Sequence, residues 1–310
     1  MEKANYDPGL TQKYGDKLSR VIRKDGQFNV RRRGTTWRDI HPYLFLINQP
    51  WPVFLTVVFA GFVAANLMFA LGYCALGVES LHGAQAPTAW GRFMNAFFFS
   101  SQTITTVGYG SIVPATAGAN LLASFEAMVG LLGFAVATGF LVGRVTRPSA
   151  RIGFSDSMIV APYGGGSSLQ FRIVNRNVSN LMEVEARMLL MTVEKDGERL
   201  ERRYAGLDLE RDRVLFMPLT WTIVHPIDAD SPLFGKTSAE LARSQAEVLI
   251  LVKGVDDTFS QTVHARYSYR YDEIAWNAGF APAFDVDADG DLRLDLDKVS
   301  KLAEGSGTAQ

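Results

Sequence analysis

Hydrophobic residues are concentrated in one part of the chain, residues 51–145, whereas charged and apolar positions are mixed on either side. Residues 51–76 contain no Asp, Glu, Lys or Arg, and residues 117–145 contain only Glu126 before Arg144. A bilayer core requires about 20 apolar residues in helical form, and both stretches are long enough. The pattern therefore predicts two membrane-spanning helices, over residues 51–76 and 117–145.

After residue 148 the chain changes to short apolar runs separated by turn residues, which is typical of β-strands. The expected strands cover residues 168–174, 185–193, 213–224, 246–252 and 261–269. A short helix is expected at 237–244, and Asp289-Gly290 favours a tight hairpin. Residues 148–300 are therefore expected to form a β-sandwich, followed by a tail at 301–310.

The segment before the first span divides in two. Residues 1–36 are polar and basic and are expected to form a mobile cytoplasmic tail. Residues 37–50 mix apolar residues with Arg38 and Asp39 and are too few to span a bilayer. Such a segment is typical of a helix lying in the membrane interface. A soluble linker is the alternative, because Pro42 interrupts the helical pattern.

The distribution of basic residues predicts the orientation of the two spans. Residues 77–116, between the spans, contain Arg92 as their only Lys or Arg. Basic residues flank the pair on both outer sides, namely Arg31, Arg32, Arg33, Arg38, Arg144, Arg147 and Arg151. Because cytoplasmic segments carry an excess of Lys and Arg, both termini are expected in the cytoplasm. The sequence thus predicts a multi-pass protein of the cell inner (plasma) membrane.

Composition and motifs exclude several classes of function. With 31 Lys and Arg against 32 Asp and Glu the net charge is −1, so no nucleic-acid partner is expected. Cys74 is the single cysteine and cannot form a disulfide within the chain. No metal-ligating spacing or nucleophile–base pair stands out, and the glycines at 164–166 lack the Lys-Ser/Thr of a phosphate loop. The sequence predicts neither an enzyme nor a cofactor.

The connection between the spans carries the chemistry. Residues 91–104 favour a helix of about 14 residues, about 21 Å long, which is too short to cross the membrane. The helix must enter and return, and irregular backbone at membrane depth is tolerated only inside protein or against water. The next residues, Thr-Val-Gly-Tyr-Gly at 106–110, are therefore expected to line a water-filled path.

These five residues suit the coordination of a dehydrated K⁺ ion. Rings of backbone carbonyls from four copies can replace the water around the ion, and Gly108 and Gly110 accept the left-handed backbone that such an array requires. The Thr106 hydroxyl can add the innermost ring of oxygens, while Val107 and Tyr109 are expected to pack behind it. The short helix directs its partly negative end towards the pore. One chain supplies one wall, so a homotetramer with K⁺ as the permeant ion is expected.

Residues 105–110, Thr-Thr-Val-Gly-Tyr-Gly, match the potassium-channel signature, and residues 37–300 resemble the inward-rectifier potassium channel family, particularly its prokaryotic (KirBac) members. The resemblance implies an α+β membrane protein with a pore domain at 51–147, a slide helix at 37–50 and an immunoglobulin-like β-sandwich. The supporting stretches are Trp-Pro-Val-Phe at 51–54, Gly130, Arg-Val-Thr-Arg-Pro at 144–148, Trp-Thr-Ile-Val-His-Pro-Ile-Asp at 221–228, Ser-Pro-Leu at 231–233, His-Ala-Arg at 264–266 and Asp-Glu-Ile-Ala-Trp at 272–276.

The resemblance also implies roles for individual residues. Cavity and gate residues are Phe134, Gly139 and Val142; ordinary helix packing is the alternative for the last two. Membrane phospholipids are expected at Arg144, Arg147 and Arg151. Gln102 and Glu126 are expected to support the filter; a buried carboxylate usually faces the bundle interior, and snorkelling or a neutral acid is the alternative for Glu126. The loop expected to narrow the cytoplasmic pore comprises Thr258, Phe259, Ser260, Gln261, Thr262 and Val263.

Departures from the family pattern change these expectations. Strong rectifiers carry Asp where this chain has Phe134, so rectification by polyamines or divalent blockers is expected to be weak. A Glu–Arg pair around the filter is replaced by Gln102 and Val113, both neutral. Two lysines of the lipid-binding cluster are replaced by Ser149 and Ala150, which leaves the sign of the lipid response open.

Three further features have simpler interpretations. His225 and His264 are expected to be structural histidines rather than pH sensors. Residues 285–290 resemble the start of a calcium loop, but Leu296 stands where the closing Glu belongs, so a hairpin is favoured.

The alternative to a channel is a non-conducting two-span sensor whose β-domain binds a soluble partner.

Overall fold

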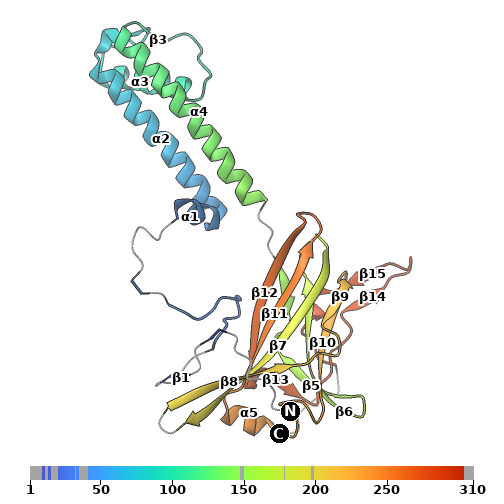
Figure 1. Ribbon diagram of the computed structural model, residues 1–310. Coiled ribbons are helices and arrows are strands. Elements are labelled where there is room, and N and C mark those ends of the chain that lie inside the picture. The colour runs from blue at the N-terminus through green and yellow to red at the C-terminus, as the bar shows by residue number, and fades with distance from the viewer. Residues whose placement is uncertain are drawn as a thin grey trace. The chain divides into compact units, whose positions relative to one another are not determined.

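The computed structural model describes residues 9–10, 13–14, 20–31, 33–34, 41–146, 150–177, 179–196 and 199–303. The chain forms two compact units (Figure 1). The first, called the membrane unit below, comprises residues 32–147. The second, the β-sandwich unit, combines residues 1–31 with residues 148–310.

The membrane unit is built of helices. They are α1 (Pro42–Asn48), α2 (Trp51–Ala75), α3 (Ala89–Ile104) and α4 (Ala117–Val145). Helices α2 and α4 have 25 and 29 residues and are apolar enough to cross a membrane, as the hydrophobic pattern predicts. Pro42 does not interrupt a helix but begins α1, because the first turn needs no amide donor from it.

Helices α2, α3 and α4 share one hydrophobic core. Phe69 and Tyr73 of α2 and Phe99 of α3 are buried in it, and the rings of Tyr73 and Phe99 meet edge to face at 5.1 Å. Large apolar residues on the other faces of α2 and α4, including Phe59 and Leu131, remain exposed in the single chain. An apolar surface of this extent is suited to lipid or to further copies of the chain.

Two large sheets form the body of the β-sandwich unit. One has the strand order β1-β8-β7-β11-β12 with β9 beside β7, and the other has the order β10-β6-β5-β13 with β4 beside β6. Their bounds are β1 (Lys13–Tyr14), β4 (Ile152–Phe154), β5 (Met158–Tyr163), β6 (Gly166–Asn175), β7 (Leu181–Asp196), β8 (Arg199–Leu207), β9 (Arg213–Phe216), β10 (Thr220–Ile227), β11 (Glu247–Asp256), β12 (Gln261–Arg270) and β13 (Ile274–Trp276).

Both sheets bury their inner faces in one core. Phe171 and Ile223 come from the sheet of β6 and β10, and Val184, Ile250 and Tyr269 come from the sheet of β7, β11 and β12. All five are buried. This is the β-sandwich that the alternating strands predict.

Some local expectations are confirmed and one is wrong. The helix expected at 237–244 is α5 (Ser238–Arg243), which starts with a capping box between Thr237 and Glu240. The Asp-Gly pair lies in the hairpin of β14 (Phe284–Val286) and β15 (Leu292–Leu294). The single strand expected at 213–224 is instead β9 and β10, in different sheets. The break lies at Pro218, which has no amide to donate to a ladder.

Residues 20–31 are packed against the β-sandwich, whereas the sequence pattern led us to expect a mobile tail. The amide of Val21 donates to the buried carboxylate of Glu247 at 3.0 and 3.1 Å. Arg20 donates to Glu273 at 3.1 Å, and Val21 and Ile22 are buried. A buried carboxylate requires donors, so Glu247 holds this segment on the sheet.

Candidate functional site

The loop at 106–110 follows directly from the end of α3. Its φ angles are 60° at Thr106, 50° at Gly108 and 78° at Gly110. Among the described residues, no heavy atom lies within 4 Å of the position that a Cβ would take on either glycine. The glycines are therefore required by backbone conformation and not by crowding. The sequence pattern indicated both glycines but not the positive φ of Thr106, which is unusual for a non-Gly residue.

The beginning of the loop is fixed on the last turn of α3. The carbonyl oxygen of Gln102 accepts hydrogen bonds from the amides of Val107 at 2.9 Å and Gly108 at 3.2 Å, and the Thr106 amide donates to Thr103 O at 3.0 Å. The last carbonyls of a helix have no partner within the helix. Here they hold the loop, so Gln102 contacts it through its backbone.

The end of the loop is fixed by a ladder that the sequence pattern did not reveal. Strands β2 (Leu81–His82) and β3 (Val113–Pro114) pair across the connection, and the Ala115 amide donates to Ser80 O at 2.8 Å. Strands of two residues are too short to leave a period in the sequence. The ladder joins the segment before α3 to the segment after the loop.

Glu126 lies in the protein interior between α2, α3 and α4. Its side chain is fully buried, and one carboxylate oxygen accepts a hydrogen bond from the Tyr73 hydroxyl at 2.6 Å. The other oxygen is hydrogen-bonded to the Ser100 hydroxyl, which also contacts the side-chain oxygen of Asn66 at 3.1 Å. The sequence pointed to Glu126 but not to its partners Tyr73 and Ser100, nor to Asn66 behind Ser100.

One helical turn beyond Glu126, helices α3 and α4 come into close contact. The Cα of Gly130 faces the carbonyl group of Ile104, the last residue of α3. An ideal Cβ on Gly130 would stand 2.2 Å from that carbonyl oxygen. Only glycine fits at this position without moving a backbone.

The C-terminal end of α4 contacts α1. The guanidinium of Arg144 donates to Ile47 O at 3.1 Å and lies over the ring of Trp51, 4.5 Å from its centroid. Tyr43 stacks on Phe140 with ring centroids 5.6 Å apart. Arg144 was expected at a phospholipid headgroup, and the structure adds this contact with α1. Arg147 lies outside the described residues.

The predicted cavity and gate residues lie outside the hydrophobic core of the single chain. Phe134 is 74% exposed and Val142 is 54% exposed. Around Gly139, no heavy atom of the described chain lies within 4 Å of a Cβ position. These positions on α4 are open to other copies of the chain or to solvent.

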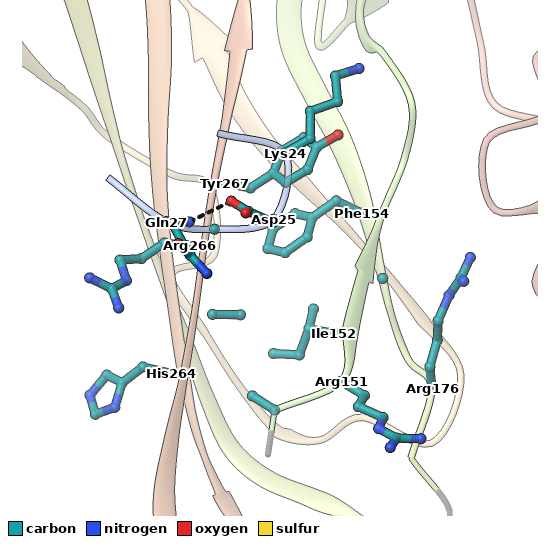
Figure 2. Close-up of a pocket in the computed structure, with 14 residues that line it drawn as sticks. Lys24, Asp25, Gln27, Arg151, Ile152, Phe154, Arg176, His264, Arg266 and Tyr267 are labelled. Carbon is teal, nitrogen blue, oxygen red and sulfur yellow. Dashed lines mark hydrogen bonds between the residues drawn. The ribbon is translucent and has the colours of Figure 1, made fainter. Parts of the chain in front are cut away.

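A basic cavity of about 660 Å³ lies in the β-sandwich unit. Figure 2 shows Arg151 and Arg176 on one side and His264 and Arg266 on the other. Phe154 of β4 and Tyr267 of β12 are stacked at 4.6 Å beside it. The turn at 24–27 closes a further side, and Gly26 allows that turn to approach the backbone of Arg266. The sequence analysis named Arg151, His264 and Arg266 separately, but it did not indicate that they lie around one cavity with Lys24 and Arg176.

The loop expected to narrow the cytoplasmic pore is held by two aspartates that the sequence analysis did not single out. Asp256, almost fully buried, accepts from the amides of Thr258 and Phe259 at 3.0 and 3.2 Å and from the Ser179 hydroxyl at 2.8 Å. Asp257 accepts two hydrogen bonds from Asn180, which lower the pKa of its carboxyl group. In the sequence, the two consecutive acidic residues before Thr258 could have indicated that side chains hold this loop.

The two histidines differ in their surroundings. His225 is buried, with Nδ1 at 2.5 Å from Asp208 O and Nε2 at 2.8 Å from Ser231 Oγ. Both ring nitrogens therefore have structural partners. His264 is exposed on β12 at the rim of the basic cavity.

Comparison with known proteins gives matches over both units. Residues 152–308 match the family described as "Inward rectifier potassium channel C-terminal domain", and residues 53–147 match the family described as "Ion channel". The chain is 37% identical over 289 residues to inward rectifier potassium channel Kirbac3.1 of Paramagnetospirillum magnetotacticum, covering 92% of this chain and 96% of that protein. It is 27% identical to ATP-sensitive inward rectifier potassium channel 12 of Bos taurus and to inward rectifier potassium channel 4 of Rattus norvegicus, each over 94% of this chain and 73% of the relative.

Proposed function

This chain belongs to the inward rectifier potassium channel family and is a membrane-spanning, potassium-selective channel, not an enzyme, and we propose that residues 106–110 form its selectivity filter. The observation that carries this assignment is the series of positive φ angles at Thr106, Gly108 and Gly110. A loop of this kind can direct carbonyl oxygens at a dehydrated K⁺. One chain supplies one wall, so the working channel is a homotetramer with the filter on its axis.

Ion flux into liposomes tests the assignment. The purified protein, reconstituted into vesicles, should take up ⁸⁶Rb⁺ in a Ba²⁺-sensitive manner and should exclude Na⁺. Absence of uptake by an intact tetramer would favour the two-span sensor instead. The Gly110→Ala variant serves as the control, since it disturbs the filter backbone alone.

We assign the cavity and the cytoplasmic constriction to α4. Phe134 and Val142 are exposed in the single chain, which leaves them available to line an axis shared by four copies, and Gly139 would allow α4 to bend. Phe134 carries no charge, so block by polyamines or divalent cations should be weak. The loop at 258–263 would continue the pore into the cytoplasm, supported by the hydrogen bonds of Asp256.

Anionic phospholipid of the inner membrane is the proposed regulator, with both chain termini in the cytoplasm and α1 at the membrane interface. Arg144, Arg147 and Arg151 are its proposed contacts, because a basic residue near an anionic surface gains about 1 kcal/mol. The cavity that includes Arg151 offers four further basic residues to a phosphate group. Arg144 would act partly through α1, since its guanidinium contacts the carbonyl of Ile47.

Neutralisation of the basic residues tests this regulation. The Arg144→Gln/Arg147→Gln double variant should lose most of the dependence of ⁸⁶Rb⁺ flux on anionic lipid, whether that lipid activates or inhibits. Arg151→Gln should weaken the dependence less, because one of several basic residues is removed from its cavity. Identical lipid dependence in wild type and double variant would refute the site. Basal flux in neutral lipid is the control for folding.

A further inference from the structure

Four polar side chains are buried where α2, α3 and α4 meet, and they are linked by hydrogen bonds. Asn66 and Tyr73 belong to α2, Ser100 to α3 and Glu126 to α4, and each is at most 1% exposed. Among residues 51–143, Arg92 is the only Lys or Arg. It lies eight residues before Ser100, about 12 Å along the helix axis, and it donates to Ala86 O at 3.2 Å. Glu126 therefore has hydroxyl partners but no cationic partner in this part of the chain.

The orientation of Asn66 is fixed by its own hydrogen bond. Its amide nitrogen donates to Phe62 O at 2.7 Å, within α2. The side-chain oxygen of Asn66 must then face Ser100, whose hydroxyl lies 3.1 Å away. The backbone oxygen of Asn66 is also close to that hydroxyl, at 3.3 Å. Ser100 thus faces two acceptors on α2.

The number of hydrogens available at the Ser100 hydroxyl decides whether Glu126 is ionised or protonated. A serine hydroxyl carries one hydrogen, and an ionised carboxylate can only accept. With Glu126 ionised, this one hydrogen would serve the Asn66 oxygens and the Glu126 oxygen together. One buried contact between two oxygens would then contain no hydrogen, which buried polar groups rarely tolerate. A hydrogen on Glu126 removes the conflict.

We propose that Glu126 is a neutral carboxylic acid that donates a hydrogen bond to Ser100. Ser100 then donates to the side-chain oxygen of Asn66, and the Tyr73 hydroxyl donates to the second oxygen of Glu126 at 2.6 Å. Every polar atom in the chain of hydrogen bonds has a partner of the right kind. Glu126 contributes no charge to the ion path.

This hydrogen bond makes Glu126 a positioning residue for the filter, which rests on the filter assignment proposed above. Helices α3 and α4 meet at Ser100 and Glu126, and again four residues later at Ile104 and Gly130. Gln102, whose carbonyl holds the amides of Val107 and Gly108, lies between these two contacts on α3. The pair of contacts fixes the last turn of α3, on which the filter begins.

The proposal is tested with Glu126→Gln and Glu126→Leu in the reconstituted full-length tetramer. The glutamine amide can donate to Ser100 and its oxygen can accept from Tyr73, so K⁺ over Na⁺ selectivity and Ba²⁺ block should stay within about twofold of wild type. Leucine has similar bulk but no hydrogen bond, and selectivity or flux should fall by about tenfold or more. If Glu126→Gln alters Ba²⁺ block as strongly as Glu126→Leu does, the charge of an ionised Glu126 is in use and the proposal is wrong.

Infrared spectroscopy supplies a readout that does not depend on conduction. The difference spectrum between wild type and Glu126→Gln at neutral pH should contain the carbonyl stretch of a protonated carboxylic acid. Glu79→Gln is the matched control, because Glu79 is exposed near the end of α2 and should contribute no such band. A carboxylate band in place of the acid band would overturn the proposal even if the protein conducts. Absence of flux in wild type would refute the channel assignment and leave the infrared result valid.

Discussion

The contact between Gly130 and Ile104 predicts that Gly130→Ala disturbs the filter. A Cβ on residue 130 would lie 2.2 Å from the Ile104 carbonyl oxygen, 2.9 Å from its carbon and 3.0 Å from its Cα. Carbon–oxygen contacts are ordinarily about 3.3–3.6 Å, so the helices must separate by about 1 Å. Both sides of the contact are backbone, so no side chain can turn away.

The cost can be estimated from overpacked cores. Inserting a methyl group into a well-packed site costs about 1–3 kcal/mol, and four copies would lose about 4–12 kcal/mol per tetramer. Because Ile104 precedes Thr105 and the filter, part of this strain should move the filter itself. We expect reduced thermal stability of the tetramer and reduced K⁺ over Na⁺ selectivity in liposome flux.

Two other glycines of α4 provide matched controls. At Gly133 and Gly139, no heavy atom of the described chain lies within 4 Å of a Cβ position. Alanine favours a helix over glycine by about 0.8–1.0 kcal/mol, so Gly133→Ala and Gly139→Ala should keep or raise stability. If α4 bends at Gly139, Gly139→Ala should lower flux without lowering the stability of the tetramer. A Gly130→Ala channel with wild-type stability and selectivity would refute the reasoning.

Three further predictions follow from other parts of the chain. Gly110→Ala should abolish K⁺ preference, since a left-handed residue with a Cβ costs about 1–2 kcal/mol per subunit; a selective mutant tetramer would contradict the filter assignment. Phe134→Asp should turn weak spermine block into strong, voltage-dependent block, because the attraction between four added charges and a tetravalent amine is worth about 3 kcal/mol after screening. Planar-bilayer recordings measure this block. A conducting mutant without added block would show that residue 134 does not face the cavity. Hydrogen bonds from Lys253 and Arg187 lower the pKa of Glu185 from 4.5 to about 2, so its stabilisation is complete above about pH 4.5 and is lost as the pH falls towards 2. The difference in melting temperature between wild type and Glu185→Gln should therefore shrink over that range, and a constant difference would argue against these ion pairs.

The spans and the left-handed backbone at Gly108 and Gly110 could be predicted because each is encoded in adjacent residues. A membrane requires a long run without charge, and residues 51–76 provide it regardless of what they contact. The positive φ angles of Gly108 and Gly110 are likewise a local property of glycine. The β-sandwich followed from alternation within single strands, although Pro218 separated one expected strand into two.

The tertiary structure alone decided which residues meet. Glu126 was notable in the sequence as a buried acid, but its hydrogen bonds with Tyr73 and Ser100 depend on the rotation and register of three helices. The role of Gly130 depends on the carbonyl of Ile104, which lies on another helix. Arg144 was expected to contact phospholipid because it lies at the end of a span. Its contact with Ile47, which is 97 positions away in the sequence, could not be expected in this way. A hydrophobic period identifies the buried face of an element but not the atoms packed against it, because that choice depends on side-chain packing across the whole core.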